Sequence, residues 1–305
     1  VKSDTPEGAP PTATLSWRAA NARSQMSAAC LINHYNYGAY VGEAIASVAR
    51  QTRPLDEILV VADGSSPDEL EELRAHVAGH PAVQLHEKPN EGQLSCFQVG
   101  LDRTEADVLF FLDADDRWQP GYVERVMQLL DERPDVDFVA TAERRVFPDG
   151  RTTENEAPSR DLGYSVVRGL DRGGRWVGQP TSCLAIRRRI VEKILPLPRA
   201  ENWRTCADEA LVYGASVVGA RKYFLGEPLV DYRMHGQNAF AGRSYEACDR
   251  LQRGIEVVRL VETLRKRYDL PADLAHLAHH EFRTIPEPVR DEYRDYCRIV
   301  NNAGL

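Results

Sequence analysis

The chain has 305 residues, with 38 Lys or Arg against 46 Asp or Glu, so its formal net charge at pH 7 is −8. Hydrophobic residues make up 43% and charged residues 28%, a composition typical of a soluble globular protein with one large domain or two smaller ones. The acidic balance argues against a general nucleic-acid binder, and no run of about 18 apolar residues predicts a membrane-spanning helix.

The first residues, 1–11, lack the succession of basic, apolar and small residues that marks a signal peptide. We therefore expect the protein in the cytoplasm, either free or peripheral at the inner face of the membrane. The six cysteines are scattered, without a C-x-x-C pair or histidines at zinc spacing. They predict neither a disulfide framework nor a zinc site.

Strand and helix signals alternate after a first segment, 1–26, that is rich in Pro, Ala, Thr and Ser and is expected to form a tail or a loosely docked arm. The pattern predicts strands at 28–32, 57–61, 83–85 and 107–112, with helices up to 49, over 68–78 and from 93 onward. Such alternation predicts a doubly wound, mostly parallel α/β sheet flanked by helices.

Turns rich in polar residues follow each of these four strands. Ligands of doubly wound sheets bind beyond the carboxyl ends of the strands, so the four turns are expected to converge on one crevice. The strand at 107–112 is apolar throughout, which predicts burial on both faces, and it ends in Asp113-Ala114-Asp115-Asp116.

The pattern is looser after Phe138. Residues 144–175 show no clear period and are expected to form a long irregular excursion beside the site. Beyond them the pattern predicts a strand at 181–186 and helices at 188–194, 207–218, 245–267 and from 271 onward. In the helix at 245–267 the apolar face is expected to comprise Leu251, Ile255, Val258, Val261 and Leu264.

The pair Asp113-x-Asp115 is the strongest chemical signal in the chain. Charge directly after a buried strand is costly unless the carboxylates face a solvated crevice or a cation. Hard divalent cations such as Mg²⁺ and Mn²⁺ prefer oxygen ligands. A helix N-cap is the alternative, but one Asp would serve for that, and here three stand within four residues.

Further motifs accompany this one, in a fixed order, over roughly 27–240. They are Tyr35-Asn36-Tyr37, Asp63-Gly64-Ser65, Asn90-x-Gly92-Gln93, Leu112-Asp113-Ala114-Asp115-Asp116-x-Trp118, Ala207-Asp208-x-x-Leu211 and Tyr232-Arg233-x-His235-x-x-Asn238. The ordered set resembles glycosyltransferases of the GT-A fold, in the large inverting group known as family 2.

The resemblance implies a catalytic domain at 27–243, with a nucleotide-binding half at 27–118 and an acceptor half at 119–243, followed by a C-terminal helical extension at 244–305. It implies metal-dependent transfer of a sugar from a nucleotide-sugar donor, with a UDP-sugar expected. The acceptor would be a hydroxyl of a saccharide or other glycoconjugate, as in polysaccharide biosynthesis. The anomeric centre would be inverted in a single displacement.

The same resemblance implies roles for individual residues. The donor nucleotide would be bound by Asn33, Tyr35, Asp63, Lys88, Gln93, Asp113 and Ala114. Asp115 would bind the divalent cation, Mn²⁺ or Mg²⁺, with His235 as a further metal or phosphate contact. Asp208 would be the general base. Trp176 and Trp203 flank the acceptor half and are candidates for stacking on an acceptor sugar, with core packing as the alternative.

The sequence departs from the commonest family pattern near the nucleotide. Ala62 stands where an Asp often precedes the Asp-Gly-Ser motif, and Ala207 replaces a Glu that commonly precedes the catalytic Asp. The first departure leaves the identity of the base open. Pro180-Thr181-Ser182 matches a subset of the family, so we interpret the departures as marks of a subfamily.

Two other functions remain open at this point. A sugar-phosphate nucleotidyltransferase would be expected to carry a Gly-rich, basic loop after its first strand, which 33–37 lacks. A non-catalytic nucleotide-sugar-binding module is disfavoured by the presence of both Asp115 and Asp208. The C-terminal helices could pack on the catalytic domain, pair two chains as a homodimer or dock on a membrane enzyme.

Two further clusters are expected to be ordinary surface. The run 187–189 of three arginines is expected to open a helix on a wet surface rather than to bind an anion. His276, His279 and His280 are expected on a solvated helix face.

Overall fold

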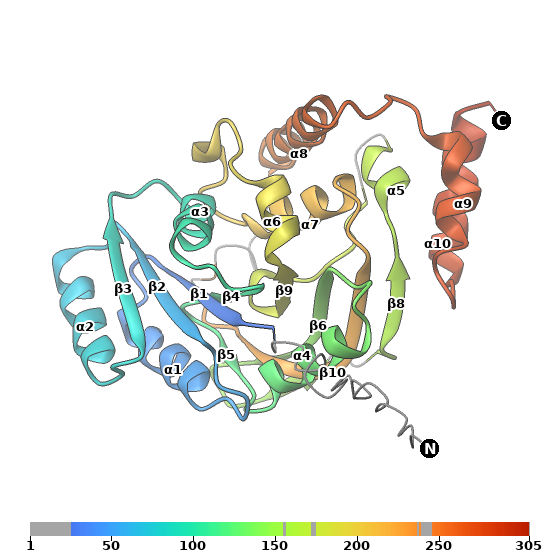
Figure 1. Ribbon diagram of the computed structural model, residues 1–305. Helices are drawn as coiled ribbons and strands as arrows, with labels where there is room; N and C mark the ends of the chain where they lie inside the picture. Colours follow the sequence, from blue (N-terminus) through green and yellow to red (C-terminus); the bar gives the residue numbers. More distant parts are fainter. Residues whose placement is uncertain (1–25, 155–156, 172–174, 237, 239–245, 305) are drawn as a thin grey trace, which may run out of the picture.

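A computed structural model gives the arrangement of residues 26–154, 157–171, 175–236, 238 and 246–304 (Figure 1). Of the predicted tail, 1–26, all but Met26 lies outside these residues. The strands of the described chain form one mixed sheet, with the order β3-β2-β1-β4-β9-β6-β10-β5 and with β7 beside β6 and β8 beside β10.

The strands are β1 (Ala28–His34), β2 (Glu57–Asp63), β3 (Val83–Lys88), β4 (Val108–Asp113), β5 (Arg117–Trp118), β6 (Phe138–Val146), β7 (Thr152–Glu154), β8 (Arg160–Gly163), β9 (Leu184–Arg187) and β10 (Lys222–Arg233). The α-helices are α1 (Gly38–Ala49), α2 (Pro67–Ala78), α3 (Gln93–Arg103), α4 (Tyr122–Glu132), α5 (Val166–Leu170), α6 (Arg188–Ile194), α7 (Asp208–Val217), α8 (Ala247–Arg267), α9 (Ala278–Phe282) and α10 (Arg290–Asn302).

The first four strands confirm the prediction of a doubly wound, mostly parallel unit. β1 pairs in parallel with β2 on one side and with β4 on the other, and β2 pairs in parallel with β3. The shared register places Asn33 of β1 beside Asp113 of β4. The polar turns after these strands therefore leave the sheet at one edge.

Helices cover both faces of the sheet, with α3, α6 and α7 on one face and α1, α2 and α4 on the other (Figure 1). Consecutive residues of a strand pack against opposite layers of helices, because their side chains point to opposite faces of the sheet. Phe111 packs in the layer of α3 and α7, and Phe110 in that of α1 and α4. Both are 0% exposed, so β4 is buried on both faces as predicted.

The second half contains more regular structure than predicted. The supposed irregular excursion at 144–175 includes the end of β6, the strands β7 and β8, and the short helix α5. The long strand β10, for which the sequence pattern gave no signal, runs parallel to β6 and antiparallel to β5 and β8. Register shifts around Pro228 interrupt its alternation, which explains the missing period.

The strand expected at 181–186 is shorter and begins later. Thr181–Cys183 form a 3₁₀ turn, and only Leu184–Arg187 pair, antiparallel, with β4 and β6. The sheet is therefore mixed in its centre. α6 begins at Arg188 as expected, but Arg187 is buried and donates from Nε to the carbonyl oxygen of Val136 at 2.7 Å, so the prediction of a wet surface was wrong for Arg187.

The helix α8 packs on α7 through Val257, Leu260, Val261 and Leu264, which are buried. The predicted apolar face was therefore wrong in part, since Leu251 is 66%, Ile255 42% and Val258 49% exposed. At 100° per residue these three side chains project about 100° or more away from the buried set. The buried face of α8 is thus formed by the four residues between Val257 and Leu264, and the periodic pattern that begins at Leu251 does not predict it.

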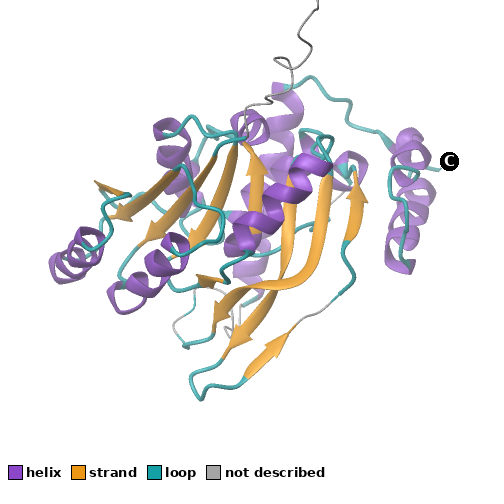
Figure 2. Ribbon diagram, turned by 60° about the horizontal axis from the view of Figure 1, so that its bottom comes forward, coloured by secondary structure: helices purple, strands orange, loops and turns teal. Residues whose placement is uncertain are grey.

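The helices α9 and α10 pack on α5 beyond the β8 edge of the sheet (Figure 2). Their shared core consists of Val167, Ala275, Ala278, Ile285, Tyr296 and Ile299. The C-terminal helices thus pack on the preceding part of the chain, which was one of the three alternatives expected for them. The expected boundary at 243/244 falls in 239–245, outside the described residues.

The three histidines near the C-terminus lie at the surface as expected. His276, His279 and His280 are exposed, and all six cysteines are free thiols. Among the described residues, none of the helices has both the length and the apolar composition needed to cross a membrane.

Candidate active site

A cavity of about 650 Å³ opens at the carboxyl ends of β1, β2 and β4. The turns after all four predicted strands contribute to it, which confirms that they converge. Its wall includes Asn33, His34, Tyr35, Tyr37, Asp63, Asn90, Gln93, Cys96, Asp113, Asp115, Trp176, Pro180, Thr181, Arg204, Thr205, Cys206, Asp208, Glu209, Tyr213, Tyr232 and Asn238.

Two glycines allow the loops after β2 and β3 to approach each other and α7. Gly64 has φ +67°, and a Cβ there would lie 2.5 Å from the backbone nitrogen of Asn90. Gly92 has φ +96°, and a Cβ there would lie 2.5 Å from the Cα of Arg204. A side chain at either position would combine backbone strain with a clash.

Asp63 at the end of β2 holds the loop that follows β3. Its Oδ1 accepts a hydrogen bond from the backbone of Glu91 at 2.9 Å and its Oδ2 one from Gly92 at 2.8 Å, while the Lys88 ammonium group pairs with Oδ1. Asp63 lines the cavity and Lys88 does not. Contact of either residue with a nucleotide stays a prediction.

The end of β1 is fixed by a neutral histidine. Burial lowers the pKa of His34 to about 4. Its Nε2 accepts a hydrogen bond from the backbone of Tyr37 at 3.3 Å, so Nδ1 carries the proton and donates it to Ser65 Oγ at 3.2 Å. Beside it, Asn33 Oδ1 is buried without a hydrogen-bond partner among the described residues.

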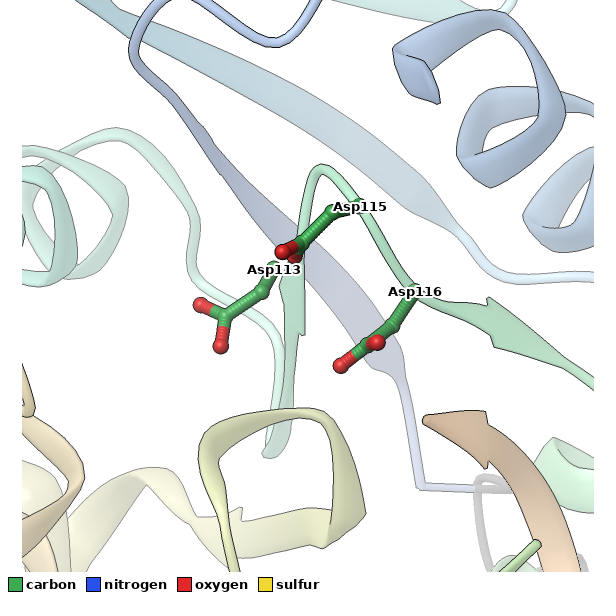
Figure 3. Close-up of side chains that lie close together, drawn as sticks. All are labelled: Asp113, Asp115 and Asp116. Carbon is green, nitrogen blue, oxygen red and sulfur yellow. The ribbon is translucent and has the colours of Figure 1, made fainter. Parts of the chain in front are cut away.

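The acidic turn between β4 and β5 carries Asp113, Asp115 and Asp116 (Figure 3), whose ligand oxygens lie within 4.8 Å of one another. Asp116 is 1% exposed and has both oxygens engaged, by Ser182 Oγ at 2.6 Å and by the backbone nitrogen of Arg233 at 2.8 Å. Asp116 therefore anchors the turn, and the other two carboxylates face the cavity.

Asp115 contacts His235, whose Nε2 lies 2.9 Å from Asp115 Oδ2. The two side chains together offer oxygen and nitrogen ligands. The imidazole stacks on the ring of Tyr40, with 4.8 Å between the centroids and 25° between the planes. These contacts bring together the two residues that the sequence assigned to the cation.

The electrostatics of this turn fit a cation. Burial, the charge of Asp115 and the charge of Asp208 together raise the pKa of Asp113 to about 8, against hydrogen bonds from Asn33 and Gln93. Burial and the charges of Asp115 and Asp113 also raise the pKa of Asp116. Clustered carboxylates repel one another, and a divalent ion with its preference for oxygen ligands would relieve that repulsion.

Gln93, the first residue of α3, links the two sides of the cavity. Its Nε2 donates to Asp113 Oδ1 at 2.8 Å, and its Oε1 accepts from the backbone nitrogen of Ala207 at 2.8 Å. One side chain thereby sets the spacing between the acidic turn and the start of α7.

Asp208 is the first residue of α7 and lines the same cavity as Asp113 and Asp115. Burial, with a smaller contribution from the charge of Glu209, raises its pKa to about 7, against the stabilising charge of Arg253. Arg253 reaches Asp208's neighbour from α8, with Nε 2.8 Å from Glu209 Oε1. A carboxyl group with a pKa near 7 is suited to general base chemistry at neutral pH.

The two candidate acceptor tryptophans differ. Trp176 is 39% exposed, lines the cavity and packs edge-on against Tyr213 with 5.9 Å between the centroids. Trp203 is 5% exposed and packs in the core with α3 and α7, so the alternative of core packing applies to it. The side chain of Ala114 is likewise buried in the core, and only its backbone could contact a nucleotide.

Several residues of the wall were not predicted. Thr181, Glu209 and Tyr213 belong to this group, together with Arg204 and Tyr232. Thr181 lies in the Pro-Thr-Ser motif, and Glu209 and Tyr213 stand within five residues after Asp208, so these three had a signal. Arg204, which hydrogen-bonds to the Asn90 side chain, had none.

Comparisons with known proteins agree with this geometry. The model of the family "Glycosyl transferase family 2" matches residues 30–195. An uncharacterised glycosyltransferase of Nostoc sp. (strain PCC 7120) is 33% identical over 247 residues, which are 76% of this chain and 73% of the relative. The minor teichoic acid biosynthesis protein GgaB of Bacillus subtilis is 32% identical over 141 residues, 45% of this chain but only 15% of GgaB.

Among solved structures, Staphylococcus aureus TarS (residues 1–349) in complex with UDP-GlcNAc aligns with a TM-score of 0.62. The alignment covers 91% of this chain and 80% of that one, at 16% sequence identity. The complex of the same fragment with UDP aligns with a TM-score of 0.58, over 90% of this chain and 71% of that one. At such identity the likeness shows a common fold.

Proposed function

This chain belongs to glycosyltransferase family 2 and is a glycosyltransferase with the GT-A fold, and from this we propose that it transfers a sugar from a UDP-sugar to a hydroxyl of a saccharide or other glycoconjugate, with inversion. One observation carries the proposal. A single cavity holds the acidic turn at Asp113 and Asp115 on one side and Asp208, with a pKa of about 7, on the other.

The donor nucleotide would lie at the ends of β1 and β2. Asn33 lines the cavity there, and an amide side chain can hydrogen-bond to the imide of uracil. Tyr35 is 49% exposed at the same edge and offers an aromatic face to the base. TarS, which shares the fold, was crystallised with UDP-GlcNAc, which supports a uridine nucleotide here.

Asp115 and His235 would hold the divalent cation, Mn²⁺ or Mg²⁺, with Asp113 on the same turn. A bound cation neutralises charge on the diphosphate leaving group. Asp116, held by Ser182 and Arg233, keeps the turn in the position that this binding requires.

The acceptor would enter on the side of α7, where Trp176 offers an exposed aromatic face. Asp208 would take the proton from the acceptor hydroxyl as its oxygen bonds to the anomeric carbon and the bond to the diphosphate breaks. Because the hydroxyl attacks opposite the leaving group, the anomeric centre is inverted. Gln93, which bonds to Asp113 and to the backbone of Ala207, would keep the acidic turn and Asp208 at the spacing that a single displacement requires.

The test is UDP release from UDP-GlcNAc with Mn²⁺ and a panel of methyl glycosides as acceptors. We expect release that depends on the glycoside and on the metal. Failure of UDP to bind in a calorimetric titration with Mn²⁺ would contradict the donor assignment. Pyrophosphate release from UTP and a sugar phosphate would indicate a nucleotidyltransferase, and UDP binding without turnover of any glycoside would indicate a binding module.

A further inference from the structure

Two residues that precede Trp176, Asp171 and Arg175, contact the C-terminal helix α10. Arg298 donates from Nη2 to Asp171 Oδ2 at 2.7 Å, and Arg175 forms an ion pair with Asp295. Residues 295 and 298 are neighbours on one face of α10 because they are three positions apart. The contacts join residues 127 and 120 positions apart in the sequence.

The carboxylate of Asp295 is well placed to hold its partner. Asp295 is 7% exposed and also lies 3.3 Å from Nη2 of Arg168, itself 7% exposed. A buried carboxylate bonded by two guanidinium groups holds its geometry better than a solvated surface pair, which salt and water screen. The Arg175 side chain is 41% exposed, and the next residue, Trp176, lines the cavity.

A buried lysine ties down the same segment from inside the fold. Lys222 of β10 is 0% exposed, and its ammonium group donates to the carbonyl oxygens of Val177 at 2.9 Å and Val212 at 2.8 Å and to Ser216 Oγ at 2.8 Å. Val212 and Ser216 belong to α7, which begins with Asp208. The residue after Trp176 is thereby tied to the helix that carries the proposed base.

Trp176 thus lies between two anchored neighbours. Arg175 is bonded to α10 and Val177 to β10, while the indole itself packs edge-on against Tyr213. Stacking on a sugar requires that the exposed ring face be held in place relative to the reacting hydroxyl, and a small displacement at such a site lowers the rate or the affinity. The anchors supply that constraint.

We propose that the C-terminal extension forms part of the acceptor site, with Asp295, acting through Arg175, as a positioning residue for Trp176. The proposal rests on the proposed function, in which Trp176 meets the acceptor. It assigns to α10 an effect on acceptor binding and none on donor binding.

The test compares Asp295→Asn, Arg175→Gln and the double variant with wild type, each made in the chain of 305 residues. Asp291→Asn is the matched control, since Asp291 is on α10 with a side chain 87% exposed. The readouts are hydrogen exchange of residues 176–180, the KM for the best methyl glycoside of the panel, and the KM for UDP-GlcNAc. The exchange measurement needs no turnover.

We expect Asp295→Asn and Arg175→Gln each to raise hydrogen exchange at 176–180 and the acceptor KM by about 3- to 10-fold, with the KM for UDP-GlcNAc unchanged. In the double variant, exchange and acceptor KM should rise no more than in the more strongly affected single variant, because both substitutions break the same ion pair. Asp291→Asn should behave as wild type.

Wild-type exchange and acceptor KM in Arg175→Gln would overturn the proposal, and so would an equal rise in both KM values, which would mean general loosening. If Asp295→Asn fails to fold, the half-exposed Arg175 alone carries the test. If wild type transfers sugar to no glycoside, the proposed function fails. Exchange at 176–180, measured with UDP and Mn²⁺ present, then still decides whether α10 holds this segment.

Discussion

The two sides of the cavity are built in different ways. On the proposed donor side, Asn33, Asp63 and Asp113 lie at the ends of adjacent parallel strands, and the register of the sheet brings them together. On the acceptor side, Trp176 is held by contacts from β10 and from α10, more than a hundred residues away in the case of Asp295. The donor side therefore depends on short motifs, and the acceptor side on tertiary contacts that can change without disturbing the chemistry.

Asp115→Asn should give the largest effect, and it tests the donor side. Loss of a charged ligand should reduce transfer by about 10³-fold, because charge on the leaving diphosphate is no longer stabilised. Turnover of UDP-GlcNAc at saturating acceptor measures this. Ser182→Ala is a useful companion, since it weakens the anchor of the turn at Asp116 without removing a ligand, and it should retain most of the activity.

Transfer at the wild-type rate by Asp115→Asn would remove the metal site from the account. A loss in Ser182→Ala as large as that in Asp115→Asn would mean that the position of the turn, and not the ligand, is limiting.

Asp208→Asn tests the opposite side and should lower kcat by about 10²- to 10³-fold, because the acceptor hydroxyl loses its base. Asn keeps the shape of the side chain, so the fold and the donor site should be unaffected. Comparison of kcat with the melting temperature separates loss of chemistry from loss of structure. A variant that is unstable as well as inactive would leave Asp208 with a structural role only.

The pH dependence should follow the same carboxyl group. With a pKa of about 7 for Asp208, the rate should rise with pH through about 7 and fall about tenfold per unit well below it, since only the deprotonated form accepts a proton. Initial rates across pH 5–9 at fixed metal and donor measure this profile. An acidic limb centred near the ordinary pKa of Asp, about 4, would contradict the assignment.

Stability should change with pH in the opposite sense. The pKa of Asp208 is higher in the folded state than in the unfolded chain, so its stabilising contribution is complete below about 4 and is lost as pH rises through about 7. Asp208→Asn should therefore be more stable than wild type at pH 8, by at most ~4 kcal/mol. Thermal unfolding of both proteins at pH 5 and pH 8 checks this. If Asp208→Asn were no more stable than wild type at pH 8, the raised pKa assigned to Asp208 would be contradicted.

The two tryptophans offer a smaller effect that separates the acceptor wall from the core. Trp176→Ala should raise the acceptor KM by about 3- to 10-fold at nearly unchanged stability, because one exposed stacking face is lost. Trp203→Ala should lower the free energy of unfolding by ~3–5 kcal/mol, because it leaves a cavity in the core. The opposite pattern would mean that the assignments of the two residues are reversed.

The smallest contrast lies on α8. Leu264→Ala, at a fully buried position, should destabilise the fold by ~2–5 kcal/mol, whereas Ile255→Ala, 42% exposed, should change stability by less than ~0.5 kcal/mol. Denaturant unfolding measures both. A large cost for Ile255→Ala would show that this face is covered in solution.

These contrasts match what the sequence could predict. Apolar runs and polar turns located β1 to β4, and the motifs located Asp115, Gln93 and Asp208, because each depends on residues near one another in the chain. The same logic failed for β10, where Pro228 interrupts the alternation, and for α8, where a periodic pattern pointed to an exposed face.

The local sequence predicts neither the ion pair of Arg175 with Asp295 nor the burial of Lys222. It also does not distinguish Trp203, which is buried, from Trp176, which is exposed. A single sequence gives no means of pairing residues that far apart. The contacts that hold Trp176 in place therefore emerged only from the fold.

The most direct test of the account is the effect of Mn²⁺ on UDP binding, measured by calorimetry in parallel for wild type, Asp115→Asn and Asp208→Asn. We predict that Asp208→Asn binds UDP with Mn²⁺ as wild type does, and that Asp115→Asn binds UDP no more tightly with Mn²⁺ than without it. An Asp115→Asn protein that keeps the Mn²⁺ effect, or an Asp208→Asn protein that loses UDP binding, would contradict the division of the cavity into a donor and an acceptor side.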